Sequence, residues 1–234
     1  MNPSLIFSYV SRGGIKLEKA LKFFKIDVKD KTALDIGAST GGFTDCLLQH
    51  AAKKVYAVDV GYGQLHWKLQ QDPKVIRVDR VNARYLKKED FPEETGFDII
   101  TVDVSFISLE KIIPAAKELL KENANMITLV KPQFEVGRGR VGGKGVVRKP
   151  ELHEEVLLKL VSFSRDSGLS PVGLTYSPVK GPEGNIEYFL NLAMDCPGHP
   201  TKRLPVDQVR GTVPILEKIK EVVNSAWHDL REER

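Results

Sequence analysis

Asp103 is the residue whose position first suggests chemistry. It closes the apolar run FDIITVD (residues 97–103), and Val-Ser-Phe follows it where a glycine turn would be usual. Lys131 ends another apolar run, NMITLV, in the same way. Charged side chains are costly inside a sheet, but they are expected where parallel strands end at a ligand cleft. The sequence therefore predicts that Asp103 and Lys131 face one active site.

A glycine-rich segment, LDIGASTGGFT (residues 34–44), follows a third apolar run and opens a helical one. Its glycines would let a ligand approach backbone N–H groups at a helix N-terminus. The segment lacks the GK[ST] of a Walker loop, and Ser39 stands where the second glycine of GxGxxG would be. Taken alone, it fits either a nucleotide-like ligand or a tight structural turn.

Two polar residues farther along favour the ligand. Asp59 ends the run KVYAVDV, about 20 residues on, where an acid can accept hydrogen bonds from a ribose diol. The alternative for Asp59 is an N-cap of the next helix. With Asn82 after the following run, the pattern resembles S-adenosylmethionine (SAM)-dependent methyltransferases more than NAD enzymes. The predicted cofactor-binding residues are Asp35, Gly37, Ser39, Thr40, Gly41, Gly42, Phe43, Asp59, Asn82 and Asp103.

The residues after Asp103 indicate the kind of acceptor. Amine methyltransferases commonly carry [DNS]PP[YFW] at the end of their fourth strand, whereas this sequence has Asp-Val-Ser-Phe. Together with Lys131, this favours an alcohol, because a ribose 2′-hydroxyl needs charged groups to orient it and take its proton. Phe106 either stacks on the target nucleoside or fills core.

Five phrases in order carry a more specific resemblance: YVSRGGIKLEKAL, DIGASTGGFTDCLL, DVSFISL, LVKPQFE and GNIEYFL. From about residue 9 to residue 194 the sequence resembles the hemolysin A (TlyA) family of FtsJ/RrmJ-like rRNA 2′-O-methyltransferases. The resemblance implies SAM as cofactor, cytidine in ribosomal RNA as acceptor, and ribosomal RNA or subunits as partners. It also implies a catalytic tetrad, neutral when fully ionised, of Lys16, Asp103, Lys131 and Glu187.

Two of the four tetrad residues, each considered alone, could also be ordinary surface residues. Lys16 could lie on the solvated face of an amphipathic helix, and Glu187 could be a surface strand residue. Which lysine would take the proton stays open, because close charges titrate as a coupled set.

The order of elements predicts the fold. Short β-rich runs alternate with helical spacing between residues 31 and 130, as in a parallel sheet with helices on both faces. The class is α/β: a Rossmann-like class I SAM-dependent methyltransferase with a seven-stranded, mostly parallel sheet and an antiparallel last strand. We predict helices over residues 15–24, 42–50, 64–71, 109–121, 150–165 and 213–230, and final strands over 169–177 and 185–194.

The predicted domains are a methyltransferase domain, residues 1–195, and a linker with an amphipathic helix, residues 196–234. That helix could pack on its own core or on a second copy as a homo-oligomer. Family members usually carry an N-terminal S4-like RNA-binding domain, and none precedes residue 9, so RNA affinity is expected to be weak. Residues 136–150 are predicted to form a mobile basic loop. The predicted RNA contacts are Arg12, Phe106, Arg138, Arg140, Lys144, Arg148 and Lys149.

The composition limits the kinds of partner and site that the chain can have. The chain has 234 residues, 41% hydrophobic and 28% charged, with a net charge of +4, which permits a polyanionic partner without requiring one. Cys46 and Cys196 lie far apart with no CxxC, so neither a disulfide framework nor a metal site is indicated, and a cytoplasmic location fits. No uncharged stretch is long enough to span a bilayer, so no stable membrane association is expected. The alternative functions are haemolysis by a membrane-active protein and a SAM-binding, RNA-binding protein without turnover.

Overall fold

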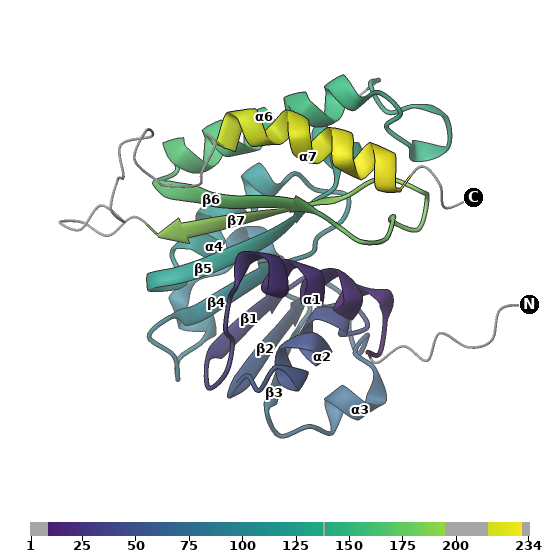
Figure 1. Cartoon of the computed structure of the whole chain (residues 1–234). Coiled ribbons are helices and arrows are strands. Elements are labelled where there is room, and N and C mark those ends of the chain that lie inside the picture. The colour runs from purple at the N-terminus through teal and green to yellow at the C-terminus, as the bar shows by residue number, and fades with distance from the viewer. Residues whose placement is uncertain (1–8, 138, 195–214, 231–234) are drawn as a thin grey trace, which may run out of the picture.

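The computed structural model describes residues 9–137, 139–194 and 215–230, and it confirms the predicted α/β class (Figure 1). The strands are β1 (Thr32–Ile36), β2 (Lys54–Asp59), β3 (Val75–Asp79), β4 (Phe97–Val102), β5 (Leu120–Val130), β6 (Leu169–Tyr176) and β7 (Tyr188–Met194). The α-helices are α1 (Arg12–Phe24), α2 (Gly42–Gln49), α3 (Trp67–Gln70), α4 (Ile113–Lys117), α5 (Pro132–Glu135), α6 (Pro150–Asp166) and α7 (Ile215–Asp229). Short 3-10 helices are η1 (Ala83–Tyr85), η2 (Lys88–Asp90), η3 (Leu109–Lys111) and η4 (Gly143–Gly145).

The seven strands form one sheet in the order β3-β2-β1-β4-β5-β7-β6. β1, β2, β3, β4 and β5 pair in parallel, whereas β7 is antiparallel to both β5 and β6. The chain therefore moves outward from β1 to β3 and then returns to place β4 on the other side of β1. In open α/β sheets, such a reversal opens a crevice at the carboxyl ends of the two strands, where ligands bind.

Alternate residues of the strands pack on opposite faces of the sheet. Leu34 and Met126 belong to a core that includes residues of α4, α6 and α7, whereas Ala33 and Ile127 belong to a core with α1 and α2. Because both faces of the central strands are covered, these strands read as continuous apolar runs in the sequence. No helix in the described part of the chain is long and apolar enough to cross a membrane.

Two predicted helices are shorter than expected. The segment predicted as a helix over 109–121 divides into η3 and α4, and the strand begins at Leu120. Two contacts with Phe97 account for this: its N–H donates to the Leu119 carbonyl at 2.8 Å, and it pairs with Leu120 in the sheet. The helix predicted over 64–71 is reduced to the single turn of α3.

The C-terminal helix packs on its own chain. Ile219, Val223 and Ala226 of α7 are buried in the same core as α6 and β6, while Leu216 at its start is 46% exposed. Most of the apolar stripe of α7 is thus buried within the chain, with Leu216 as an exposed member.

Asp35 is a carboxylate without any exposed surface, in the middle of the sheet at β1. Its two oxygens accept hydrogen bonds from the hydroxyls of Thr44, at 2.7 Å, and Thr101, at 2.9 Å. Burial raises the pKa of the Asp35 carboxyl to about 7, although both hydroxyls oppose the shift. Asp35 therefore ties β1 to β4 and α2 beneath the glycine loop, and its side chain does not make the direct cofactor contact predicted from the sequence.

The packing of α7 gives a first prediction. Val223→Asp places an unpaired charge in a fully buried position, so the free energy of unfolding should fall by roughly 3 kcal/mol or more. Urea denaturation followed by circular dichroism measures this loss. Asn224→Asp, at the exposed next position, is the matched control and should change stability little. Equal effects of the two substitutions would show that α7 is not docked.

Asp35 gives a second prediction. Between about pH 4 and pH 7 the native carboxyl holds its proton while the unfolded one has lost it, so stability falls as pH rises through this window. Asp35→Asn cannot ionise. The unfolding free energy of the parent relative to this variant should therefore drop by roughly 2 to 3 kcal/mol between pH 5 and pH 7.5. Urea denaturation at the two pH values tests this, with the exposed Asp30→Asn as control; a difference independent of pH would contradict the prediction.

Candidate active site at the carboxyl ends of β1 and β4

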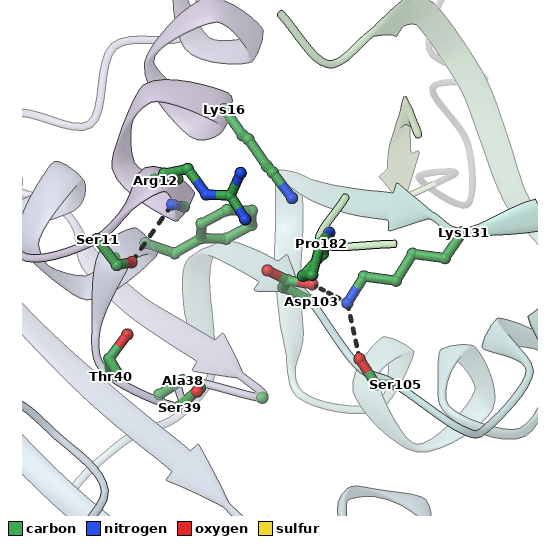
Figure 2. Close-up of a pocket in the computed structure, with 14 residues that line it drawn as sticks. Ser11, Arg12, Lys16, Ala38, Ser39, Thr40, Asp103, Ser105, Lys131 and Pro182 are labelled. Carbon is green, nitrogen blue, oxygen red and sulfur yellow. Dashed lines mark hydrogen bonds and ion pairs between the residues drawn. The ribbon is translucent and has the colours of Figure 1, made fainter. Parts of the chain in front are cut away.

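A cavity of about 260 Å³ opens where the strand order reverses. Residues from the N-terminus of α1, the loop after β1, the ends of β4 and β5, and the segment before β7 converge on it (Figure 2). Its lining residues are Ser11, Arg12, Gly13, Lys16, Gly37, Ala38, Ser39, Thr40, Gly42, Phe43, Asp103, Ser105, Lys131 and Pro182. The cavity thus contains three of the predicted tetrad residues and much of the predicted cofactor loop.

The glycine loop is shaped by close backbone packing. A Cβ at Gly37 would lie 2.4 Å from the Asp103 carbonyl oxygen, and one at Gly42 would lie 2.2 Å from the Ser11 hydroxyl. Gly37 and Gly41 have φ of 83° and 94°, and Ser39 also adopts a left-handed φ of 49°. Ser39 therefore takes the conformation that the missing glycine of the motif would have taken.

Asp59 and Asn82 do not line the cavity, and of the two it is Asp59 that hydrogen-bonds to the glycine loop. The carboxylate of Asp59 accepts the Ser39 N–H at 2.8 Å and the Gly61 N–H at 2.7 Å. Asn82 accepts the Arg84 N–H at 3.1 Å and so caps η1. The structure gives Asp59 a role in holding the loop, and its alternative as an N-cap of a helix is wrong.

The four tetrad residues form two ion pairs. Lys16 Nζ lies 2.6 Å from Glu187 Oε2, and Lys131 Nζ lies 2.6 Å from Asp103 Oδ1. The side chains of the first pair are 9% and 1% exposed, and those of the second are 12% and 22% exposed. Burial raises the pKa of Glu187, the charges of Lys16 and Lys131 oppose the rise, and the charge of Asp103 adds to it. The two pairs are therefore close enough to act on one another.

Each tetrad side chain comes from a different element. Lys16 lies on the buried side of α1, not on the solvated face that its surroundings in the sequence allow. Asp103 and Lys131 directly follow β4 and β5, and Glu187 directly precedes β7. A Cβ at Gly181 would lie 2.5 Å from Glu187 Oε1, so the backbone there closes over this carboxylate.

Phe106 and Arg12 lie near the mouth of the site. The Phe106 side chain is 91% exposed, its backbone has a left-handed φ of 64°, and its ring centroid lies 5.0 Å from that of Phe134. The alternative in which Phe106 fills core is therefore wrong. Arg12 begins α1 and lines the cavity.

The basic loop is more constrained than predicted. Arg140 forms a bidentate ion pair with Glu155, with distances of 2.6 and 2.5 Å. The Asn185 side chain donates to the Gly145 carbonyl and accepts the Val147 N–H, so this part of the loop is fixed to the segment before β7. The prediction of a mobile loop is wrong at this point. Exposed side chains are present at Lys144, Arg148 and Lys149, and Arg138 lies outside the described residues.

Sequence reasoning missed Ser105, Ser11 and Pro182 as cavity residues. Ser105 had a usable signal, because it stands two positions after Asp103 in a motif already singled out. Ser11 could have been recognised as a helix cap, since its side chain accepts the Gly13 N–H at 3.3 Å. Pro182 had no signal, because only the folded chain brings it to the cavity.

Comparison with known proteins identifies the family of the chain. The model of the FtsJ-like methyltransferase family matches residues 9–194. The chain is 50% identical over 210 residues to "Putative rRNA methyltransferase YqxC" of Bacillus subtilis, covering 90% of this chain and 74% of that protein. It is 47% identical over 185 residues to "16S/23S rRNA (cytidine-2'-O)-methyltransferase TlyA" of Mycobacterium tuberculosis, covering 78% of this chain and 68% of that protein.

A solved structure is similar over nearly the whole chain. It is described as "Putative hemolysin from Streptococcus thermophilus", with a TM-score of 0.87 and 44% sequence identity, and the match covers 99% of this chain and 78% of that one. The family match covers most of the chain, and two curated relatives are 47% and 50% identical to it. The chain belongs to the FtsJ-like methyltransferase family.

Proposed function

We propose that this chain transfers a methyl group from SAM to the 2′-hydroxyl of a cytidine in ribosomal RNA. One observation carries the proposal: the Lys16–Glu187 and Lys131–Asp103 ion pairs lie at the same cavity as the glycine loop. The names of the relatives support the substrate, since the Mycobacterium tuberculosis protein is a cytidine-2′-O-methyltransferase of 16S and 23S rRNA. Ribosomal RNA is then the partner, and the cytoplasm the place of action.

The residues around the loop fit SAM. Positions 37 and 42 leave space only for glycine, because the loop packs against the Asp103 backbone and the start of α1, and both glycines line the cavity at the N-terminus of α2. Asp59 is proposed to bind the ribose and Asn82 to lie near the adenine, while the cavity-lining loop residues hold the rest of the cofactor. Those loop residues are Gly37, Ser39, Thr40, Gly42 and Phe43. When bound, SAM supplies a methyl group on a sulfonium centre, which an oxygen nucleophile can accept.

The tetrad is suited to an alcohol acceptor. A ribose hydroxyl is a weak acid, so it needs an acceptor for its proton and a fixed orientation. Lys131 lies at the more open ion pair, where its Nζ can contact the hydroxyl, while Asp103 holds the lysine in place. Lys16 and Glu187 form the inner pair and keep the combined charge of the four groups at zero when all are ionised.

RNA would reach the cavity past the basic loop. Lys144, Arg148 and Lys149 are exposed and make no ion pair with any described residue, whereas Arg140 is already paired with Glu155. Such cations would contact phosphates without regard to base sequence. Phe106 and Arg12 are proposed to contact the target nucleotide.

A third prediction concerns turnover. Lys131→Ala should reduce methyl transfer by about a thousandfold and leave SAM affinity near normal, because the lysine acts on the acceptor. Incorporation of label from radiolabelled SAM into ribosomal subunits that lack the modification, followed by mass mapping of 2′-O-methylated nucleotides, measures the reaction. Asp103→Ala should show a similar loss that does not add to that of Lys131→Ala.

The exposed Lys111→Ala, in η3 and outside the cavity lining, is the control for Lys131→Ala. Parent-like turnover in Lys131→Ala would refute the tetrad. Haemolysis of red cells without methyl transfer would favour the membrane-active alternative, and SAM and RNA binding without transfer would favour a protein that binds RNA but does not methylate it.

A fourth prediction concerns RNA binding. Changing Lys144, Arg148 and Lys149 to Gln should flatten the salt dependence of RNA binding, by roughly 0.7 to 0.9 in log K per log unit of salt for each lost phosphate contact. SAM affinity should not change. Filter binding to ribosomal RNA across a salt series measures the slope.

The control changes Lys25, Lys29 and Lys53 to Gln. These exposed lysines precede β1 and β2 and so lie at the opposite edge of the sheet. A loop variant whose salt slope equals that of the parent would show that the RNA is held elsewhere.

A further inference from the structure

Ser105 lines the cavity and contacts the Lys131 ammonium group. Lys131 Nζ donates to Ser105 Oγ at 2.9 Å, and the same nitrogen lies 2.6 Å from Asp103 Oδ1. All three side chains line the cavity, and Figure 2 shows Lys131 Nζ between the other two. The Lys131 nitrogen is therefore held by one hydrogen bond and one ion pair, both from the segment that follows β4.

The tetrahedral shape of the Lys131 nitrogen makes its hydrogen bond to Ser105 directional. Beyond its bond to Cε the nitrogen has three positions, and Ser105 Oγ occupies one of them. The Asp103 carboxylate lies 2.6 Å away in an ion pair that lacks hydrogen-bond geometry, so it attracts the ammonium group without fixing its rotation. The positions that remain present N–H groups in a charged lysine and include a lone pair in a neutral one, and Ser105 restricts where they point.

The segment carrying Ser105 is anchored at both ends. At its start, the Asp103 N–H donates to the Ile36 carbonyl at 2.9 Å. At its end, the buried Glu135 accepts the Ser108 hydroxyl at 2.7 Å and the Leu109 N–H at 2.8 Å. Glu135 belongs to α5, the short helix that begins directly after Lys131. Ser105 and Lys131 are thus parts of one connected unit, and their relative position does not depend on a free loop.

The turn after Ser105 adds a second constraint. Phe106 adopts a left-handed φ of 64°, a conformation that is unfavourable for a non-glycine residue. This turn leaves the Phe106 ring exposed at the rim while Ser105 faces Lys131. The backbone is thus held in an uncommon conformation at the point that directs Ser105 to the ammonium group.

We propose that Ser105 is a positioning residue for methyl transfer: its hydroxyl, together with the ion pair to Asp103, orients Lys131 Nζ toward the acceptor hydroxyl. The inference rests on the proposed function, because it assigns to Ser105 a role in the chemistry of Lys131. Without the hydroxyl, the amine keeps only Asp103 and can rotate about its last side-chain bonds. Loss of orientation lowers the rate of reaction without weakening the binding of either substrate.

The test compares Ser105→Ala with Ser105→Thr, which keeps the hydroxyl. Steady-state methyl transfer from tritiated SAM to ribosomal subunits that lack the modification gives kcat and KM, and calorimetry gives the SAM dissociation constant. Ser105→Ala should lower kcat by about tenfold with KM and SAM affinity unchanged, and Ser105→Thr should restore most of kcat. Ser225→Ala, an exposed serine on α7, is the control and should match the parent.

Other outcomes overturn the inference and separate it from the proposed function. A parent-like kcat in Ser105→Ala beside an inactive Lys131→Ala overturns the role of Ser105 alone. A raised KM for the subunits at unchanged kcat overturns it as well, since Ser105 would then be an RNA contact. Parent-like turnover in Lys131→Ala refutes the proposed function itself. Because Ser105 is exposed, Ser105→Ala should unfold at the same temperature as the parent, so a loss of rate cannot be assigned to misfolding.

Discussion

The site depends on the pairing of two largely buried lysines with two carboxylates. A charge removed from water is costly unless an opposite charge lies close to it, and the N–O distance is 2.6 Å in both pairs. Each partner comes from a different part of the chain: α1, the end of β4, the end of β5 and the start of β7. The pairing therefore specifies how α1 and three strands must come together, and any arrangement that separates them leaves a buried charge alone.

The sheet makes this convergence feasible. Reversal of the strand order between β1 and β4 opens a space at their carboxyl ends, and the loop after β1 borders it. That loop must pass within contact distance of the β4 backbone, which is why position 37 is glycine. Asp35 fixes the same region from below through Thr44 and Thr101. The buried acid, with its pKa raised to about 7, thus joins two strands and a helix beneath the glycine loop.

Much of this arrangement was predictable from the sequence because it is local or periodic. The strands appear as apolar runs, the glycine loop as a strand-to-helix turn, and the tetrad through motifs that resemble a known family. What escaped prediction involves distant contacts or competition between elements. Arg140 is paired with Glu155, fifteen positions away. Asn185 binds the basic loop at residues 38 and 40 positions away. Strand pairing by Leu120 shortens the helix that the apolar periodicity predicts over residues 109–121. None of these can be read from spacing alone.

The two ion pairs differ in their exposure to water, so a substrate can reach one carboxylate and not the other. Glu187 is 1% exposed and is covered by the backbone at Gly181, whereas Asp103 is 22% exposed at the cavity wall. A substrate hydroxyl must arrive from the open side, so it meets the pair formed by Lys131 and Asp103 first. Within the inner pair the two partners differ as well, because Lys16 lines the cavity whereas Glu187 does not. Glu187 therefore depends on Lys16 for its nearest opposite charge, and the inner pair is suited to holding α1 against the sheet.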